Sequence, residues 1–111
     1  MVLSFHMSEK RKPTYDIEAI KAAMSSVGLL KVTGSALRGA ASLGFGRHEI
    51  ITTIHSISRR HFYKSMTSNA DHRIWQDVYH VPTKVGILYI KFTIDSVAEF
   101  LLLSFKEKGH D

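Results

Sequence analysis

Apolar residues recur at two different spacings along this chain, and the spacing changes near the middle. In the first half they recur every three or four residues, as on a helix with one buried face. This pattern covers residues 14–27, a short stretch that ends at Leu43, and residues 50–57. Pro13 and Gly28 bound the first segment, while Thr33 or Ser35 can cap the second before Gly44. We therefore expect three short helices, and a short strand at residues 29–33 between the first two.

In the second half, apolar and polar residues alternate, which is the period of a β-strand. The candidate strands cover residues 61–67, 74–81, 86–95 and 100–107. In the stretch GILYIKFTID, alternate residues are expected to face the core, namely Leu88, Ile90, Phe92 and Ile94. In the last strand the same pattern selects Leu101, Leu103 and Phe105. Helices followed by a run of strands predict an α+β fold, with N-terminal helices packed on one face of a mainly antiparallel sheet.

Matching the core-facing residues of consecutive strands predicts how the strands pair. For the last hairpin this matching places Ile90 opposite Phe105 and Phe92 opposite Leu103, with a loop from residue 96 to residue 99. On the other face, it places Tyr89 opposite Lys106.

The two earlier hairpins are matched in the same way. The middle one turns around residues 82–85, and Gln76 then lies opposite Lys91. In the first one Lys64 lies opposite Gln76. One face of the sheet would then carry Lys64, Gln76, Tyr89, Lys91 and Lys106, together with the apolar Phe62, Met66, Ile74 and Val78. Such a mixed face suits RNA, because bases stack on apolar groups while lysines contact phosphates.

Composition narrows the class of protein. The chain has 111 residues and a formal charge of +5, which fits one small domain with a bias toward polyanions. We expect a flexible extension over residues 1–12 and a single domain over residues 13–111. The absence of cysteine excludes disulfides, thiol nucleophiles and cysteine-ligated metals, and fits an intracellular compartment. No run of about 18 apolar residues predicts a membrane span.

Several sequence motifs follow one another in an order typical of a known family. They are KVTGSAL at 31–37, FYKSMT at 62–67, DHRIWQDVY at 71–79 and SFKEK at 104–108. Over residues 10–108 the chain resembles the MqsR family, the motility quorum-sensing regulator toxins. It departs from the family pattern at His80, where relatives commonly have Arg, and in a longer segment at residues 95–100.

The resemblance implies a RelE-like fold and a function. MqsR proteins are bacterial, cytoplasmic mRNA interferases of type II toxin–antitoxin systems. They are endoribonucleases that cleave mRNA at GCU-type sites without a ribosome or a cofactor, and so inhibit translation in stress and quorum sensing. Their partner is the antitoxin MqsA, which has a zinc-binding part and a helix-turn-helix DNA-binding part. The family's functional positions fall here on Lys64, Gln76, Tyr89 and Lys106.

These residue types suit metal-free RNA cleavage, in which a 2′-hydroxyl attacks the adjacent phosphorus. We expect Lys64 and Lys106 to neutralise the phosphate, Tyr89 to donate a hydrogen bond or a proton, and Gln76 to orient the RNA. Further RNA contacts are expected from Tyr63, Met66, Arg73, His80 and Lys91.

Two other sets of observations bear on the site. The seven histidines show no spacing typical of metal ligands, so no metal site is expected. His72 lies in the motif and is either an acid–base group or a structural loop residue.

Two alternative functions stay open at this point: a non-catalytic RNA- or DNA-binding module, and an interaction protein whose basic surface binds an acidic partner.

Overall fold

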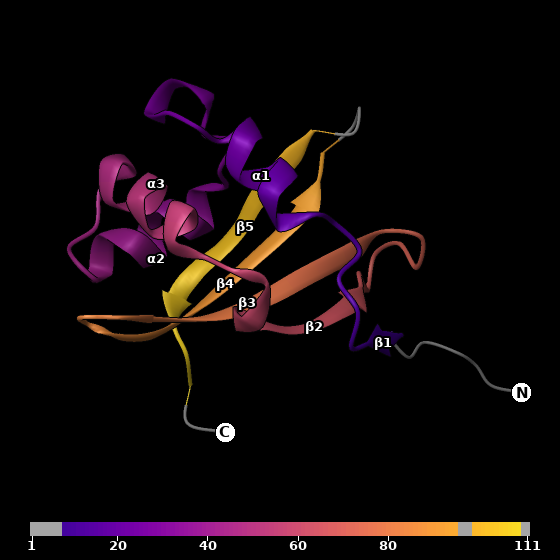
Figure 1. Ribbon diagram of the computed structural model, residues 1–111. Coiled ribbons are helices and arrows are strands. Elements are labelled where there is room, and N and C mark those ends of the chain that lie inside the picture. The colour runs from indigo at the N-terminus through magenta and orange to yellow at the C-terminus, as the bar shows by residue number, and fades with distance from the viewer. Residues whose placement is uncertain (1–7, 96–98, 110–111) are drawn as a thin grey trace, which may run out of the picture.

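In the part of the chain that the structure describes, three helices pack on a five-stranded sheet. The helices cover one face of that sheet (Figure 1). The structure is a computed structural model that describes residues 8–95 and 99–109. The helices are α1 (Ile17–Ala23), α2 (Gly34–Ser42) and α3 (Arg47–Ser56), and short 3-10 turns lie at Val27–Leu29 and Arg59–His61. The strands are β1 (Glu9–Lys10), β2 (Phe62–Thr67), β3 (Trp75–Thr83), β4 (Gly86–Ile94) and β5 (Phe100–Glu107). They pair in chain order, each antiparallel to the next, which confirms the predicted α+β class and is consistent with a RelE-like fold.

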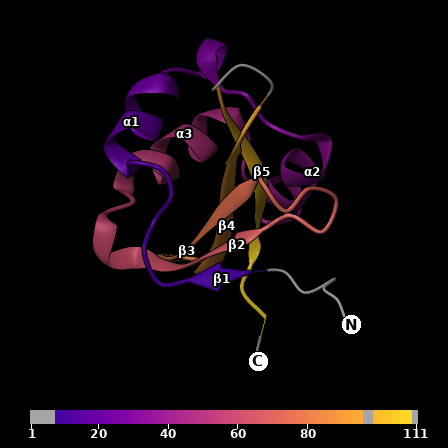
Figure 2. The ribbon, with the colours of Figure 1, turned by 90° about the vertical axis from the view of Figure 1, so that its right-hand side faces the viewer.

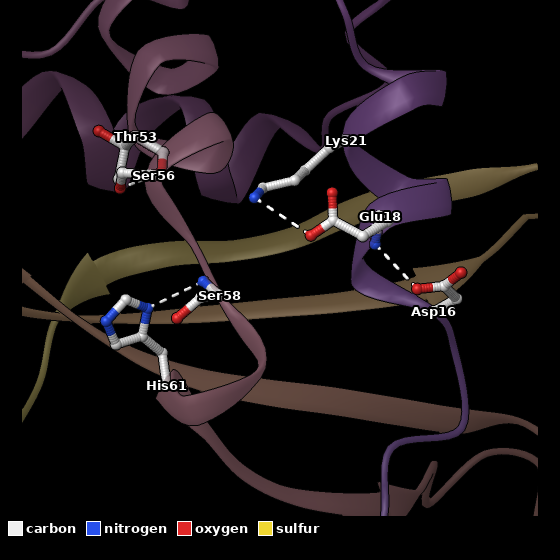
Figure 3. Close-up of polar contacts among 7 residues, drawn as sticks. All are labelled: Asp16, Glu18, Lys21, Thr53, Ser56, Ser58 and His61. Atoms are coloured by element: carbon white, nitrogen blue, oxygen red, sulfur yellow. Dashed lines mark hydrogen bonds and ion pairs between the residues drawn. The ribbon is translucent and has the colours of Figure 1, made fainter.

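Local capping fixes where the helices begin. The Asp16 carboxylate accepts a hydrogen bond of 3.0 Å from the backbone N–H of Glu18 at the start of α1, and Glu18 pairs with Lys21 at 3.4 Å (Figure 3). The Thr33 hydroxyl accepts a 3.1 Å hydrogen bond from the backbone N–H of Ala36, so Thr33 caps α2. The first helix is shorter than predicted, because it ends before the separate turn at Val27–Leu29.

The predicted strand at residues 29–33 is absent. In its place, Val32 makes a single parallel bridge to Leu102 of β5. This short bridge leads directly into α2, which packs on the same strand. Gly39 permits that close packing, since a Cβ at this position would collide with the carbonyl oxygen of Phe105.

The hydrophobic core lies between the helices and the covered face of the sheet (Figure 2). The helices contribute Ile17, Ile20, Ala36, Ala40, Ile50, Ile51 and Ile54, and the sheet contributes Tyr79, Val81, Leu88, Ile90, Phe92, Leu102 and Phe105. Val78 is also fully buried but does not belong to this cluster, because strand alternation turns it to the other face. The sheet therefore has one face packed under the helices and an outer face that no helix of the described residues covers.

Within the part of the expected N-terminal extension that the structure describes, residues 9 and 10 form a short strand. Glu9 pairs with Met66 and Lys10 with Ser65, so β1 adds a fifth strand beside β2. The hydroxyl of Thr67 also accepts a 2.9 Å hydrogen bond from the backbone N–H of Ser8. Residues 1–7 of the expected extension lie outside the described residues.

The last hairpin confirms most of the predicted register. Ile90 lies opposite Phe105 and Tyr89 lies opposite Lys106. A bulge then shifts the pairing, so that Phe92 faces Leu102 and not Leu103 as predicted. Leu102 is therefore the leucine that is fully buried in the core. The predicted loop at residues 96–99 lies mostly outside the described residues.

The two earlier hairpins differ from the predicted register by two residues. Lys91 faces Val78 in place of Gln76, and Lys64 also faces Val78 in place of Gln76. A shift of two residues leaves every side chain on its predicted face. Phe62 is the exception, because a bulge between Phe62 and Lys64 places it on the core side, against Tyr79.

Candidate active site

The outer face of the sheet contains a groove of about 570 Å³. It is lined by residues of β2, β3, β4 and β5 and of the segment after β5: Tyr63, Lys64, Met66, His80, Tyr89, Lys106, Lys108 and Gly109. Three lysines and two tyrosines around one open depression form a site suited to a polyanion with stacking bases.

The bulge in β2 shapes one wall of the groove. It inserts Tyr63 as an extra residue, and the Tyr63 ring stacks on the imidazole of His80 with centroids 4.1 Å apart and planes 21° apart. His80 lies opposite Tyr89 in the β3–β4 pairing, and these two rings are 6.1 Å apart. The three rings thus form a row across three strands.

Lys64 is tied to the N-terminal strand. Its ammonium forms a 2.7 Å ion pair with the Glu9 carboxylate, and the Lys64 side chain is 21% exposed. The hydrogen bond and the charge of Lys64 lower the pKa of Glu9, so this carboxylate is ionised at neutral pH. The pair therefore holds Lys64 at the rim of the groove with its charge satisfied within the chain.

Tyr89 lies among the other cations of the outer face. The ammonium of Lys106 is 5.2 Å from the centre of its ring, and that of Lys91 is 6.0 Å away. Burial raises the pKa of Tyr89, so its hydroxyl remains a hydrogen-bond donor at neutral pH. Burial also lowers the pKa of Lys91, and the charges of Lys106 and Lys64 act in the same direction.

Comparison with known proteins decides the family. The family described as "Motility quorum-sensing regulator, toxin of MqsA" matches residues 12–107 of this chain. The chain belongs to this MqsR toxin family. One relative, the mRNA interferase toxin MqsR of Escherichia coli (strain K12), is 39% identical over 100 residues, which cover 90% of this chain and 99% of the relative.

The structure brings together most of the residues that the MqsR resemblance singled out. Lys64, Tyr89 and Lys106 line the groove from three different strands. Among the expected RNA contacts, Tyr63, Met66 and His80 also line it, from β2 and β3. Gln76 does not line it. It lies opposite Met66, on the outer face but farther along β3.

Two other expected RNA contacts lie outside the groove lining. Lys91 is on the outer face, half-buried between Val78 and Ser104. Arg73 is in the loop between β2 and β3, where its side chain is 88% exposed and forms two hydrogen bonds to Asp71, at 3.0 and 3.1 Å. Those hydrogen bonds raise the pKa of Arg73, which stays charged. His72 is an exposed residue of the same loop.

Sequence reasoning missed three residues of the site. Lys108 and Gly109 line the groove, and Glu9 pairs with Lys64. Alternation beyond Lys106 in SFKEK was a usable signal for Lys108. Glu9 had no such signal, because its partner lies 55 positions away along the chain.

Two general observations complete the description of this MqsR family member. Within residues 8–95 and 99–109, no three histidine or acidic side chains cluster as metal ligands would. Over those same residues, each helix is too short or too polar to cross a lipid bilayer.

Proposed function

We propose that this toxin is an endoribonuclease that cleaves mRNA at GCU-type sites without metal or ribosome, in the groove of the outer sheet face. The observation that carries the proposal is the convergence of Lys64, Tyr89 and Lys106 on one groove from β2, β4 and β5. The name of the Escherichia coli relative, an mRNA interferase toxin, supports the same activity.

The reaction needs an activated 2′-hydroxyl, a neutralised phosphate and a protonated leaving group. Attack of the 2′-oxygen forms a new bond to phosphorus and breaks the bond to the 5′-oxygen, which leaves a 2′,3′-cyclic phosphate and a 5′-hydroxyl. Lys64 and Lys106 supply positive charge to the phosphoryl oxygens, where negative charge increases in the transition state. The Tyr89 hydroxyl donates a hydrogen bond to the same phosphate or a proton to the 5′-oxygen.

The remaining expected residues act on the RNA chain beyond the cleaved bond. Tyr63 and Met66 offer apolar surfaces to bases next to the groove. Gln76 lies farther along β3 and can hydrogen-bond a base edge or phosphate of a neighbouring nucleotide. Arg73 in the β2–β3 loop and Lys91 on the outer face contribute further positive charge for the phosphates of the RNA.

An antitoxin of the MqsA type is the protein partner that family membership supports. We propose further that this antitoxin has a zinc-binding part and a helix-turn-helix DNA-binding part, and that the pair acts in the cytoplasm. Binding of the purified toxin to such an antitoxin, measured by calorimetry, tests this partner assignment.

RNA cleavage by the purified chain tests the main proposal. A defined RNA with GCU and control triplets is incubated in EDTA, without ribosomes, and its new ends are mapped. We expect cuts beside GCU that carry 5′-hydroxyls, and a loss of at least about 100-fold in Lys64→Ala and in Lys106→Ala. Lys84→Ala is the matched control, because Lys84 is an exposed lysine of the β3–β4 turn that does not line the groove.

The outcomes separate the possible functions. Full activity in both groove variants would remove these lysines from the reaction. Intact RNA that the folded wild-type chain still binds would identify a non-catalytic binding module instead. Cleavage that EDTA abolishes would refute the metal-independent chemistry.

A further inference from the structure

His80 lines the groove between the rings of Tyr63 and Tyr89. Its ring is stacked on Tyr63 at 4.1 Å, and Tyr89 lies directly across from it on β4. Lys64 and Lys106, the residues proposed to hold the phosphate, line the same groove. The imidazole therefore shares one groove with the lysines proposed to bind the phosphate.

Two other histidine rings of the described chain have structural partners. His61 Nδ1 accepts a 3.0 Å hydrogen bond from the backbone N–H of Ser58 (Figure 3), and His55 Nε2 lies 3.2 Å from the carbonyl oxygen of Met24. For His80, no hydrogen bond from residues 8–95 or 99–109 engages either ring nitrogen, although stacking fixes the plane of the ring. Its nitrogens therefore remain available to a ligand in the groove.

The charges around His80 favour its neutral form. The groups that face it are Tyr63 and Lys64 on β2, Tyr89 on β4, Lys106 on β5 and Lys108 after β5, with Glu9 of β1 paired to Lys64. Burial lowers the pKa of His80, and the positive charges of Lys108 and Lys64 lower it further. A pKa below its ordinary value of about 6.5 leaves the imidazole unprotonated, and able to accept a proton, at pH 7.

We propose that His80 is the general base of the cleavage reaction and removes the proton of the attacking 2′-hydroxyl. This inference rests on the endoribonuclease function proposed above. One ring nitrogen of His80 takes the proton as the 2′-oxygen bonds to phosphorus. A protonated group of the groove, Tyr89 or a lysine, gives a proton to the departing 5′-oxygen. His80 then returns its proton to solvent and the group that acted as acid regains one from solvent, so the net reaction consumes neither acid nor base.

The pH dependence of cleavage tests this role. We expect kcat/KM of the wild-type chain to rise with pH through the pKa of His80 and then level off, because only the neutral imidazole accepts a proton. NMR titration of the His80 ring in the RNA-free protein must give the same pKa as this acidic limb. A difference of more than about one pH unit would overturn the assignment without any substitution.

Substitutions provide the second test. His80→Gln and His80→Arg should each lower cleavage at pH 7 by at least about 100-fold and abolish the acidic limb. Arginine keeps a planar cation that contacts phosphate but cannot accept a proton. His80→Phe preserves an aromatic ring against Tyr63 and should be as inactive as His80→Gln. His48→Gln, an exposed histidine of α3, is the control and should keep wild-type activity and its limb.

The results distinguish this proposal from the one on which it rests. If the wild-type chain cleaves RNA and the Arg or Phe variant does so equally well, His80 only binds or packs, and the nuclease function stands. If the wild-type chain does not cleave RNA at any pH, both proposals fail together. If the His80 variants lose most of their activity but their residual kcat/KM still rises with pH as in the wild-type chain, His80 is not the base.

Discussion

The ion pair between Glu9 and Lys64 occupies the Lys64 ammonium before RNA binds. Glu9 holds the Lys64 ammonium at 2.7 Å, so an incoming phosphate has to compete with a carboxylate of the same chain. Both side chains are partly exposed, and water and salt weaken their attraction. The pair is therefore a mild competitor that also keeps Lys64 oriented toward the rim.

We predict that Glu9→Gln increases the affinity for RNA by roughly two- to fivefold, the range expected for loss of an exposed ion pair. The reason is that Lys64 would then meet phosphate without leaving a charged partner. Fluorescence anisotropy with an uncleavable 2′-O-methyl RNA measures this change.

The control for that experiment is Glu107→Gln. Glu107 is an exposed carboxylate at the end of β5, and its loss changes the net charge of the protein by the same amount. Equal gains in the two variants would mean that total charge, and not the contact with Lys64, controls affinity.

At the scale of elements, Asp77 connects the sheet to the segment before α1. This fully buried carboxylate accepts hydrogen bonds from the backbone N–H of Thr14 at 2.9 Å and of Tyr15 at 2.8 Å. The Tyr15 hydroxyl in turn donates a 2.8 Å hydrogen bond to the carbonyl oxygen of Trp75. Asp77 belongs to the motif DHRIWQDVY, yet strand alternation places it on the face opposite to the groove.

Asp77→Asn should therefore lower the free energy of unfolding by about 2–3 kcal/mol, the range for hydrogen bonds to a charged group. An amide has one acceptor oxygen, and its NH₂ group would face backbone donors. Urea denaturation measures the loss, and Glu107→Gln again serves as a control that should change little. A nearly unchanged midpoint would show that the buried charge costs about as much as its hydrogen bonds contribute.

Elements also show what the sequence could and could not predict. Alternation identified the strands and the face of nearly every side chain, which is why Lys64, Tyr89 and Lys106 were expected together. Alternation has a period of two, so it cannot choose between registers that differ by two residues. For this reason the predicted register between β3 and β4 was wrong by two residues. Its turn is shorter than predicted, with Gly86 at a φ of +118° directly after Lys84 and Val85.

Bulges account for the remaining errors of register and face within the four predicted strands. Because Tyr63 is an extra residue in β2, the Phe62 side chain lies on the core side of the sheet. Because the register shifts after Lys91, Leu102 and not Leu103 is buried in the core. A bulge adds one residue to one strand and breaks alternation without leaving a mark in the pattern itself. The stack of Tyr63 on His80, and with it the row of rings across the groove, depends on such a bulge and could not be predicted.

At the scale of the whole molecule, part of the positive charge lies where RNA is proposed to bind. The formal charge is +5, and Lys64, Lys106 and Lys108 all line one groove. Neutralising about three phosphates of a single strand should give a slope near −2 when the logarithm of the binding constant is plotted against that of salt concentration.

Lys106→Ala should make this slope less steep by about 0.7, because one counterion fewer is released. Lys84→Ala should leave it unchanged. Anisotropy titrations of uncleavable RNA at several salt concentrations give both values. A slope that responds equally to the two substitutions would assign the salt effect to net charge and not to the groove.

Both edges of the sheet are occupied by short pieces of the same chain. On one edge, β1 pairs with β2 at Met66 and Ser65. On the other edge, the backbone N–H of Leu102 donates a 2.8 Å hydrogen bond to the carbonyl oxygen of Lys31. The carbonyl oxygen of Leu102 accepts a 3.1 Å hydrogen bond from the backbone N–H of Thr33. An uncovered strand edge is a template for joining sheets of different molecules, and it promotes aggregation. These two segments, which carry little of the core, therefore shorten the stretch of β2 and β5 edge that is open to pairing with another molecule.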